Sequence, residues 1–131
     1  MMDKYSSFSG RVVHGEKVGR TIGFPTLNIA VLQGNIPKEG VYIVKTFAEK
    51  VKYFGIMSIG NRPTFTAGEL RSIEIHLLDT FGDFYDSHVE VFPLCFLREN
   101  KKFNSIDELK IQLHTDKDIA ENLLNVYNND K

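Results

Sequence analysis

Hydrophobic positions in the first three quarters of the chain recur at every second residue, in short runs separated by Gly, Pro and Asn. This alternation, with many β-branched side chains, is typical of strands that bury one face. The runs are "GRVVHG", "GVYIVKTF", "KYFGIMSIG", "RSIEIHLLD" and "HVEVFPLCFL", and "TLN" lies in a further extended segment. Between the runs, "NIPKEG", "NRPTFTAGE" and "TFGDFYDS" have the composition of turns or loops. The pattern predicts about six strands between residues 9 and 98.

The hydrophobic spacing changes after residue 104. The segment "SIDE", residues 105–108, matches a capping box, in which the Ser hydroxyl accepts the Glu amide proton and the Glu carboxylate returns to the cap. Apolar residues then recur at helical spacing, at Ile106, Leu109, Leu113, Ile119, Leu123 and Leu124. The sequence therefore predicts a helical part over about 105–126.

An all-β body followed by one helical element favours a mostly β, α+β architecture. A sheet of this size leaves two unpaired edges, and closure into a barrel pairs both of them. The chain has 131 residues, of which 42% are hydrophobic, enough for one core and too few for two full enzyme domains. We therefore predict a single domain over 1–131, with a barrel over about 9–98 and the helical part after it.

Composition and charge exclude several classes of protein. The formal net charge of −1 gives no basic field for nucleic acid. Cys95 is the only cysteine, which excludes an intrachain disulfide and disfavours a cysteine zinc site. No apolar run approaches the roughly 20 residues that cross a bilayer, and the start "MMDKYSSFSG" lacks the apolar stretch of a secretion signal. These features predict a cytoplasmic protein without a membrane partner.

The stretch "GRTIGFPTLN" contains candidate chemistry for a phosphate and a metal ion. Thr26 and Asn28 offer hard oxygen atoms, and residues i and i+2 of an extended segment project to the same face. Magnesium prefers oxygen ligands and keeps several waters, so two neutral ligands suffice where a nucleotide supplies the rest. The preceding Gly15–Gly23 segment has the glycines of an anion-binding turn, although it lacks the Walker pattern. The alternatives are a plain hairpin loop and side chains that satisfy turn amides.

A candidate base lies in "SIEIHLL". Ile73, Ile75 and Leu77 alternate toward one face of the predicted strand, so that Glu74 and His76 share the other. A strand carboxylate can accept the proton of an alcohol as a phosphoryl group arrives. The alternatives are an exposed strand glutamate and His76 as the base, although a strand histidine is more often a packing or hydrogen-bonding residue.

Five segments in order, "GRVVHGEKVGRTIGFPTLN", "GVYIV", "SIGNRPTF", "IEIHLLD" and "LRENKKF", resemble the riboflavin kinase (flavokinase) family. The resemblance covers Tyr5 to about Leu124, and it is specific to the kinase module of the bacterial bifunctional enzyme. It implies a closed six-stranded antiparallel β-barrel with a C-terminal α-helix. It also implies transfer of the γ-phosphoryl group of ATP to the 5′-hydroxyl of riboflavin, giving FMN and ADP.

The resemblance assigns roles to individual positions. It implies Glu74 as the catalytic carboxylate and Thr26 and Asn28 as ligands of Mg²⁺, with Zn²⁺ or Mn²⁺ as alternative ions. The implied ATP contacts are Gly15, Arg20, Thr26, Asn28, Leu77, Asp79 and Tyr85. The implied flavin contacts are Arg98, Lys101 and Phe103. The family usually has Gly where this chain has Asp86, and Asp tolerates a positive φ better than most residues.

Two other functional classes of protein are compatible with the same barrel. One is a flavin-binding regulatory module without turnover, which would not need the Thr26, Asn28 and Glu74 set. Another is an oligonucleotide-binding barrel, which the charge and the lack of a basic-aromatic stripe disfavour. The expected partners are riboflavin and ATP. The chain is either part of a bifunctional protein that carries an FMN adenylyltransferase domain or a stand-alone kinase. A monomer is expected.

Overall fold

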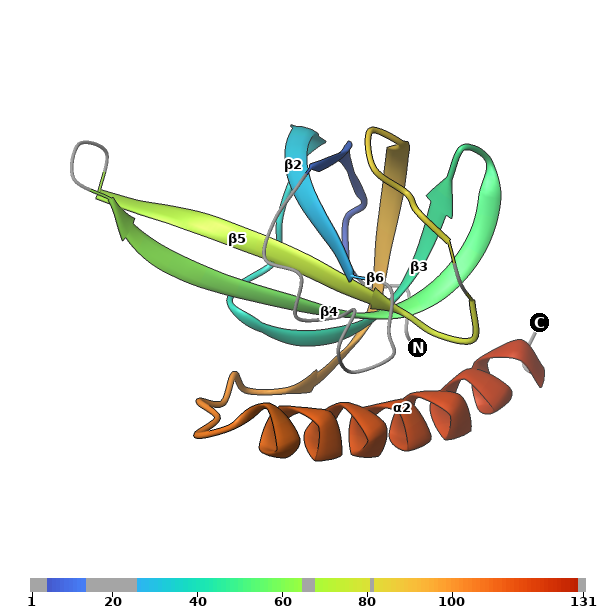
Figure 1. The fold of residues 1–131 in the computed structure, drawn as a ribbon. Helices are drawn as coiled ribbons and strands as arrows, with labels where there is room; N and C mark the ends of the chain where they lie inside the picture. The colour runs from blue at the N-terminus through green and yellow to red at the C-terminus, as the bar shows by residue number, and fades with distance from the viewer. Residues whose placement is uncertain (1–4, 14–25, 65–67, 81, 130–131) are drawn as a thin grey trace.

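Six strands close into one antiparallel barrel with a helix beneath it (Figure 1). The computed structural model describes residues 5–13, 26–64, 68–80 and 82–129, with only the backbone described for 61–64, 68–71 and 127–129. The elements are β1 (Phe8–Val13), β2 (Thr26–Gly34), β3 (Gly40–Ala48), β4 (Val51–Thr64), β5 (Gly68–Leu77), β6 (His88–Arg98) and α2 (Ile106–Asn129). Around the barrel the order is β1-β2-β5-β4-β3-β6. The predicted fold class is confirmed.

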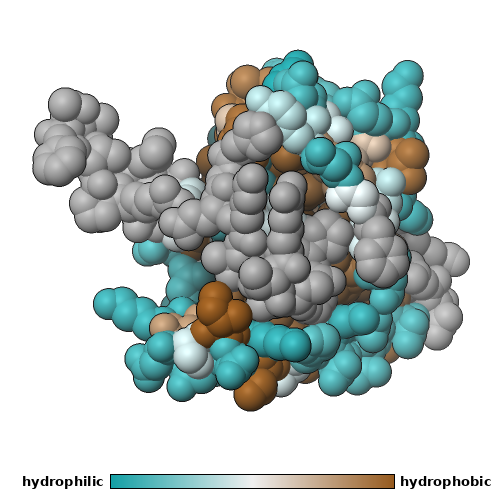
Figure 2. Space-filling model, in the orientation of Figure 1, coloured by the Kyte–Doolittle hydropathy of each residue, from teal (hydrophilic) through white to brown (hydrophobic). Residues whose placement is uncertain are grey.

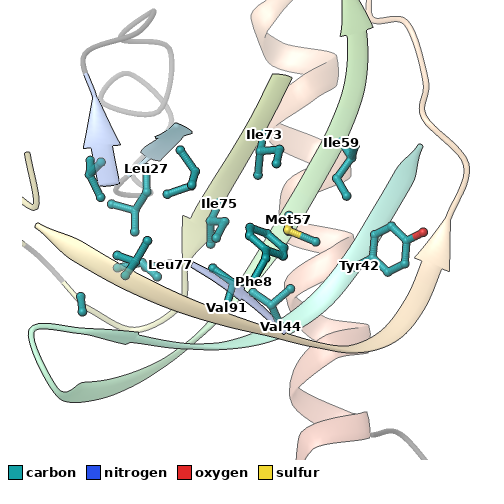
Figure 3. Close-up of a cluster of buried hydrophobic side chains, with 14 residues drawn as sticks. Phe8, Leu27, Tyr42, Val44, Met57, Ile59, Ile73, Ile75, Leu77 and Val91 are labelled. Atoms are coloured by element: carbon teal, nitrogen blue, oxygen red, sulfur yellow. The ribbon is translucent and has the colours of Figure 1, made fainter. Parts of the chain in front are cut away.

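The alternating residues of the strands fill the barrel interior, as Figure 3 shows. Leu27 from β2, Met57 from β4 and Ile75 from β5 are each at most 2% exposed. The interior cluster consists of Phe8, Val12, Leu27, Ile29, Tyr42, Val44, Ala48, Met57, Ile59, Ile73, Ile75, Leu77, Val89 and Val91. Since side chains alternate between the two faces of a strand, the residues between these positions point to the outside of the barrel.

A second apolar cluster lies between the outside of the barrel and α2. Its members are Val41, Ile43, Ile56, Leu78 and Leu94 from the barrel side, and Leu113, Ala120 and Leu124 from the helix. The three helix positions lie at i, i+7 and i+11, which is one face of an α-helix. Much of the helix surface along the bottom of Figure 2 is hydrophilic. Within the described parts of the chain, no helix has the length and apolar character needed to span a membrane.

The predicted loop "NRPTFTAGE" is wrong over most of its length. β4 and β5 stay paired from Gly55↔Leu77 as far as Thr64↔Gly68, and this hairpin extends away from the barrel (Figure 1). Pro63 suggested a loop because it cannot donate a ladder hydrogen bond. In a two-stranded ribbon each strand has an open edge, where proline is tolerated.

The β3–β4 hairpin closes through a two-residue turn. Ala48 pairs with Val51, and the residues between them, Glu49 and Lys50, have positive φ values of 49° and 74°. Positive φ at both positions is the requirement of a type I′ turn. A carboxylate oxygen of Glu49 accepts a hydrogen bond from the backbone N–H of His88 at 2.8 Å, which holds the turn against β6.

The start of α2 is capped as its sequence predicts, with one difference. The backbone N–H of Glu108 donates to the Ser105 hydroxyl oxygen at 3.1 Å. The Glu108 carboxylate accepts from the N–H of Asn104 at 3.0 Å, one residue before the predicted partner. Both bonds satisfy amide groups that the helix leaves without an internal acceptor.

We expect Ser105→Ala to lower the free energy of unfolding by about 1 kcal/mol, because it removes the side-chain acceptor of the helix cap. Urea denaturation followed by circular dichroism measures the change. Ser105→Asp is the matched control, since Asp caps as well as Ser. Equal destabilisation by both variants would contradict a capping role for Ser105.

Candidate active site

The outer faces of β2 and β5 carry four polar side chains in two adjacent pairs. Thr26 pairs with His76, and Asn28 pairs with Glu74. Residues directly opposite in an antiparallel pair have Cβ atoms about 5 Å apart. Leu27 fills the interior between the two β2 residues and is 2% exposed. The predicted shared face of Thr26 and Asn28, and that of Glu74 and His76, are therefore confirmed.

The Asn28–Glu74 pair belongs to a row that crosses five strands of the barrel. Glu74 pairs on its other side with Ser58 of β4. Ser58 pairs with Val41 of β3, and Val41 pairs with Arg98 of β6. Neighbouring strands are about 4.8 Å apart, so Glu74 and Arg98 are separated by roughly 14 Å along the sheet. This row, Asn28–Glu74–Ser58–Val41–Arg98, is called the cross-strand row below.

A cavity of about 450 Å³ lies over the cross-strand row, between the barrel and the first half of α2. Its lining residues are Thr26, Glu39, Val41, Ser58, Gly60, Glu74, His76, Arg98, Asn100, Lys101, Phe103, Leu109 and Leu113. At one end are the candidate metal ligand Thr26 and the candidate base Glu74. At the other are the three predicted flavin contacts, with apolar walls from the helix. Such a mix of apolar walls and a few polar groups is typical of a small-molecule site.

A buried carboxylate on α2 holds the Arg98 end of the cavity. Asp116 is fully buried, and its oxygens accept hydrogen bonds from Arg98 Nε at 3.0 Å and Nη2 at 2.8 Å. Gln112 Nε2 donates to the same carboxylate at 2.9 Å. Lys101 Nζ in turn donates to Gln112 Oε1 at 2.9 Å. Two of the predicted flavin contacts, Arg98 and Lys101, are thus connected through one network to the helix.

His76 lines the cavity and is buried, with 6% of its surface exposed. Burial lowers its pKa from 6.5 to about 4, and the negative charge of Asp116 opposes this only partly. The imidazole is therefore neutral at pH 7. It contributes no positive charge beside Glu74 or Arg98.

We expect this depressed pKa to make folding sensitive to acid. Between pH 6.5 and about 4 the unfolded chain binds a proton at His76 that the folded chain does not, so stability falls as the pH falls through this window. A shift of this size corresponds to about 3 kcal/mol. Urea denaturation of the metal-free protein from pH 7 to pH 4 should show a smaller acid loss for His76→Gln than for the wild type. Identical pH profiles for the two proteins would contradict the prediction.

Four predicted nucleotide contacts of the described residues are not among the residues that line this cavity, namely Asn28, Leu77, Asp79 and Tyr85. Leu77 is 1% exposed and its side chain fills the barrel interior. Asp79 lines a separate cavity of about 580 Å³ with Glu121, and its carboxylate lies 3.2 Å from Lys117 Nζ. The hydrogen bond to Asp79 raises the pKa of Lys117. Desolvation raises the pKa of Glu121, and the neighbouring Asp79 adds to this shift.

Two non-glycine residues of the loop after β5, Asp79 and Asp86, have positive φ values, of 53° and 67°. Tyr85 is half exposed, and its N–H donates to the Asp83 carboxylate at 3.0 Å. Asp86 has a φ of 67°, the conformation for which glycine is usual. Arg11 Nη1 donates to the carbonyl oxygen of Asp86 at 2.9 Å and stabilises the loop there.

Two predicted contacts and one loop lie outside the described residues. Gly15 and Arg20, with the rest of the Gly15–Gly23 loop, lie in the range 14–25, which the structure does not describe. The sequence also allows Asn61, Arg62 and Thr64 to contact phosphate, and their side chains lie outside the described residues as well.

Comparison with known proteins decides the family. The family model described as "Flavokinase: Riboflavin kinase" matches residues 2–124, nearly the whole chain. The chain belongs to the riboflavin kinase family. Its relatives include the "Bifunctional riboflavin kinase/FMN adenylyltransferase" of Escherichia coli (strain K12), 43% identical over 84% of this chain and 35% of that protein. The protein of the same description from Haemophilus influenzae is 41% identical over 88% of this chain and 38% of its own length.

A solved structure shares the riboflavin kinase-like fold. A crystal structure described as a macrolide-efflux protein from Streptococcus pneumoniae superposes with a TM-score of 0.82 at 38% sequence identity. The match covers 88% of this chain and 38% of that one. The present chain thus spans little more than a third of the length of the proteins it matches.

Sequence reasoning missed the residues that hold the Arg98 end of the cavity. Neither Asp116 nor Gln112 is among the site residues predicted from the sequence, although Asp116 is fully buried. Asn100, whose Nδ2 donates to the Ile59 carbonyl at 2.9 Å, also lines the cavity. The one available signal was the apolar pair Leu113 and Ala120 on both sides of Asp116, which places position 116 on the buried face of the helix.

Proposed function

We propose that this member of the riboflavin kinase family transfers the γ-phosphoryl group of ATP to the 5′-hydroxyl of riboflavin, giving FMN and ADP. The cross-strand row is the observation that supports this most directly. One cavity contains the Glu74 carboxylate beside the Thr26 hydroxyl and, roughly 14 Å along the sheet, a guanidinium beside apolar walls, while Asn28, which is not among the lining residues, pairs with Glu74. This suits a substrate with a reacting hydroxyl at one end and a flat ring at the other.

Phosphoryl transfer depends on positioning and on neutralising charge on the phosphate oxygens. In the proposal, Thr26 and Asn28 hold a Mg²⁺ ion together with phosphate oxygens and waters, a donor set of hard oxygens that fits this ion. When bound, the ion supplies neutralisation of the phosphate charge. Gly15 and Arg20 are proposed to add phosphate contacts, and Asp79, Tyr85 and the backbone of Leu77 to contact the rest of the nucleotide.

Glu74 is proposed to orient the 5′-hydroxyl and to accept its proton. The oxygen of that hydroxyl forms the new bond to the γ-phosphorus, the bond to the β–γ bridging oxygen breaks, and the proton passes to the carboxylate. Because the transition state is loose, orientation of the hydroxyl is the larger part of the role. Neutral His76 beside it is then a hydrogen-bonding neighbour.

Arg98, Lys101 and Phe103 are proposed to hold the flavin ring. Phe103 and the helix residues Leu109 and Leu113 offer an apolar face, and Arg98 offers hydrogen-bond donors to the polar edge of the ring. An FMN adenylyltransferase domain is a further proposed partner, since the relatives named above are bifunctional. We also propose that the protein acts in the cytoplasm.

The test is to incubate the purified chain with riboflavin, ATP and magnesium, and to measure FMN and ADP by chromatography. We expect equal amounts of both products, and none without ATP or with the metal chelated. Binding of riboflavin without FMN formation would support the flavin-binding regulatory module instead. Failure to bind riboflavin at all would reject both functions.

A further inference from the structure

Asp116 is the most deeply buried charged group among the described residues. It lies in the middle of α2 and is 0% exposed. Its helix neighbours Leu113 and Ala120 pack in the apolar cluster against the barrel. A carboxylate in such a place is costly unless it is paired and hydrogen-bonded, so its partners indicate what it does.

The main partner is Arg98, held in a defined orientation. Nε and Nη2 donate to the two Asp116 oxygens at 3.0 and 2.8 Å, a bidentate arrangement on one side of the guanidinium. Nη1 donates to the Glu99 carbonyl oxygen at 2.9 Å. A guanidinium has five N–H groups. Bonds to described residues use three of them, which leaves one on Nη1 and one on Nη2.

Those two remaining groups are suited to a ligand. Arg98 lines the cavity, and its side chain is 17% exposed although the carboxylate beneath it is almost completely covered. With Nε and one N–H of Nη2 held by Asp116, rotation of the guanidinium would break two charge-assisted hydrogen bonds at once. The orientation of the other N–H groups is thereby fixed by a residue of α2.

A second connection runs from the same carboxylate to Lys101. Gln112 donates to Asp116 through Nε2 at 2.9 Å and accepts from Lys101 Nζ through Oε1 at 2.9 Å. The Gln112 amide is therefore oriented by both charged groups. The negative charge of Asp116 also acts on His76, but burial keeps this imidazole neutral at pH 7, so that it adds no competing positive charge.

We infer that Asp116 is a positioning residue for the flavin ring. It orients Arg98 so that the remaining N–H groups of Nη1 and Nη2 point into the cavity. There the two donors meet two neighbouring acceptor atoms at the polar edge of the ring. This rests on the proposed function. A planar heterocycle with adjacent carbonyl and nitrogen acceptors matches two coplanar donors, whereas an ammonium group would offer no such pair. Asp116 touches no substrate atom in this account and acts through Arg98.

The test is the riboflavin dissociation constant of Asp116→Asn, measured by quenching of flavin fluorescence without nucleotide. We expect it to rise about tenfold, the factor for one lost charge-assisted hydrogen bond. KM for ATP should stay within about twofold, because the change is confined to the ring end of the cavity. In an Arg98→Gln background the same substitution should have no further effect, because Asp116 acts through Arg98.

The matched control is Leu123→Ala, a half-buried α2 residue that packs against the same apolar cluster without contacting the network. It should lower the melting temperature and leave riboflavin affinity unchanged. Equal loss of affinity in Asp116→Asn and Leu123→Ala would reduce Asp116 to a structural role and overturn the inference. If Asp116→Asn lowers riboflavin affinity by the same factor in the Arg98→Gln background, the inference is overturned as well.

A second variant serves if Asp116→Asn does not fold. Arg98→Lys keeps the ion pair but removes the donor pair, so it should lose riboflavin affinity to a similar extent; unchanged affinity would overturn the inference. Wild-type protein that neither binds riboflavin nor forms FMN overturns the proposed function and the inference with it. Wild-type FMN formation with an unchanged Asp116→Asn affinity overturns the inference alone.

Discussion

Glu74→Gln should lower kcat for FMN formation by roughly 10²- to 10⁴-fold, the usual contribution of a positioned acid–base group. The amide keeps the size of the side chain and its place in the cross-strand row, but it cannot accept the hydroxyl proton. Riboflavin affinity should change little, because the ring end of the cavity is three strands away. Steady-state kinetics and fluorescence quenching measure the two quantities separately.

Glu90→Gln is the matched control for Glu74→Gln. Glu90 is an exposed strand glutamate on β6, beside a different cavity, and its change should leave kcat within about twofold, as expected for a surface substitution. Wild-type turnover in Glu74→Gln would remove the role of Glu74 as the base. His76→Gln would then be the next variant to assay, since His76 shares the same face and cavity.

Asn28→Ala should weaken the use of Mg-ATP by roughly 10- to 100-fold in kcat/KM, the cost of losing one contact to a charged group. The effect should be partly overcome by raising the magnesium concentration. Binding of riboflavin without metal should stay near its wild-type value, because Asn28 does not line the cavity.

The control for this metal site is Asn122→Ala on the exposed side of α2, which removes an amide of the same kind from a surface position. Its magnesium titration should match that of the wild type. If Asn28→Ala shows an unchanged magnesium requirement, the metal assignment is wrong. Thr26→Ala would then decide whether any metal ligand lies on β2.

The faces of the strands could be predicted from the sequence because strand periodicity is local. Leu27 between Thr26 and Asn28, and Ile75 between Glu74 and His76, fix which side chains point outward once the segment is extended. The capping box at Ser105 is equally local. Its one difference, the Glu108 carboxylate bonding to Asn104, is a shift of one residue at a helix end, where boundaries are least defined by sequence.

Pairing between distant segments could not be predicted in this way. That Glu74 faces Ser58 and that Val41 faces Arg98 depends on the register of β4 and β3, which no local pattern contains. The error over residues 61–64 and 68–69 has a different cause: Pro and Gly suggested a loop, but β4 and β5 stay paired in a local hairpin as far as Thr64↔Gly68. The role of Asp116 was missed because its partner Arg98 lies 18 residues away, and no local pattern contains that ion pair.

Closure of the barrel restricts where the chain can change length. Glu74 is paired on both sides, to Asn28 and to Ser58, so one residue inserted into β5 would send the carboxylate into the hydrocarbon interior. The Glu49–Lys50 turn is about eight residues along β3 from the cavity, roughly 26 Å. Insertions among related sequences should therefore gather at hairpin tips of this kind, and an epitope tag placed there should be harmless to turnover.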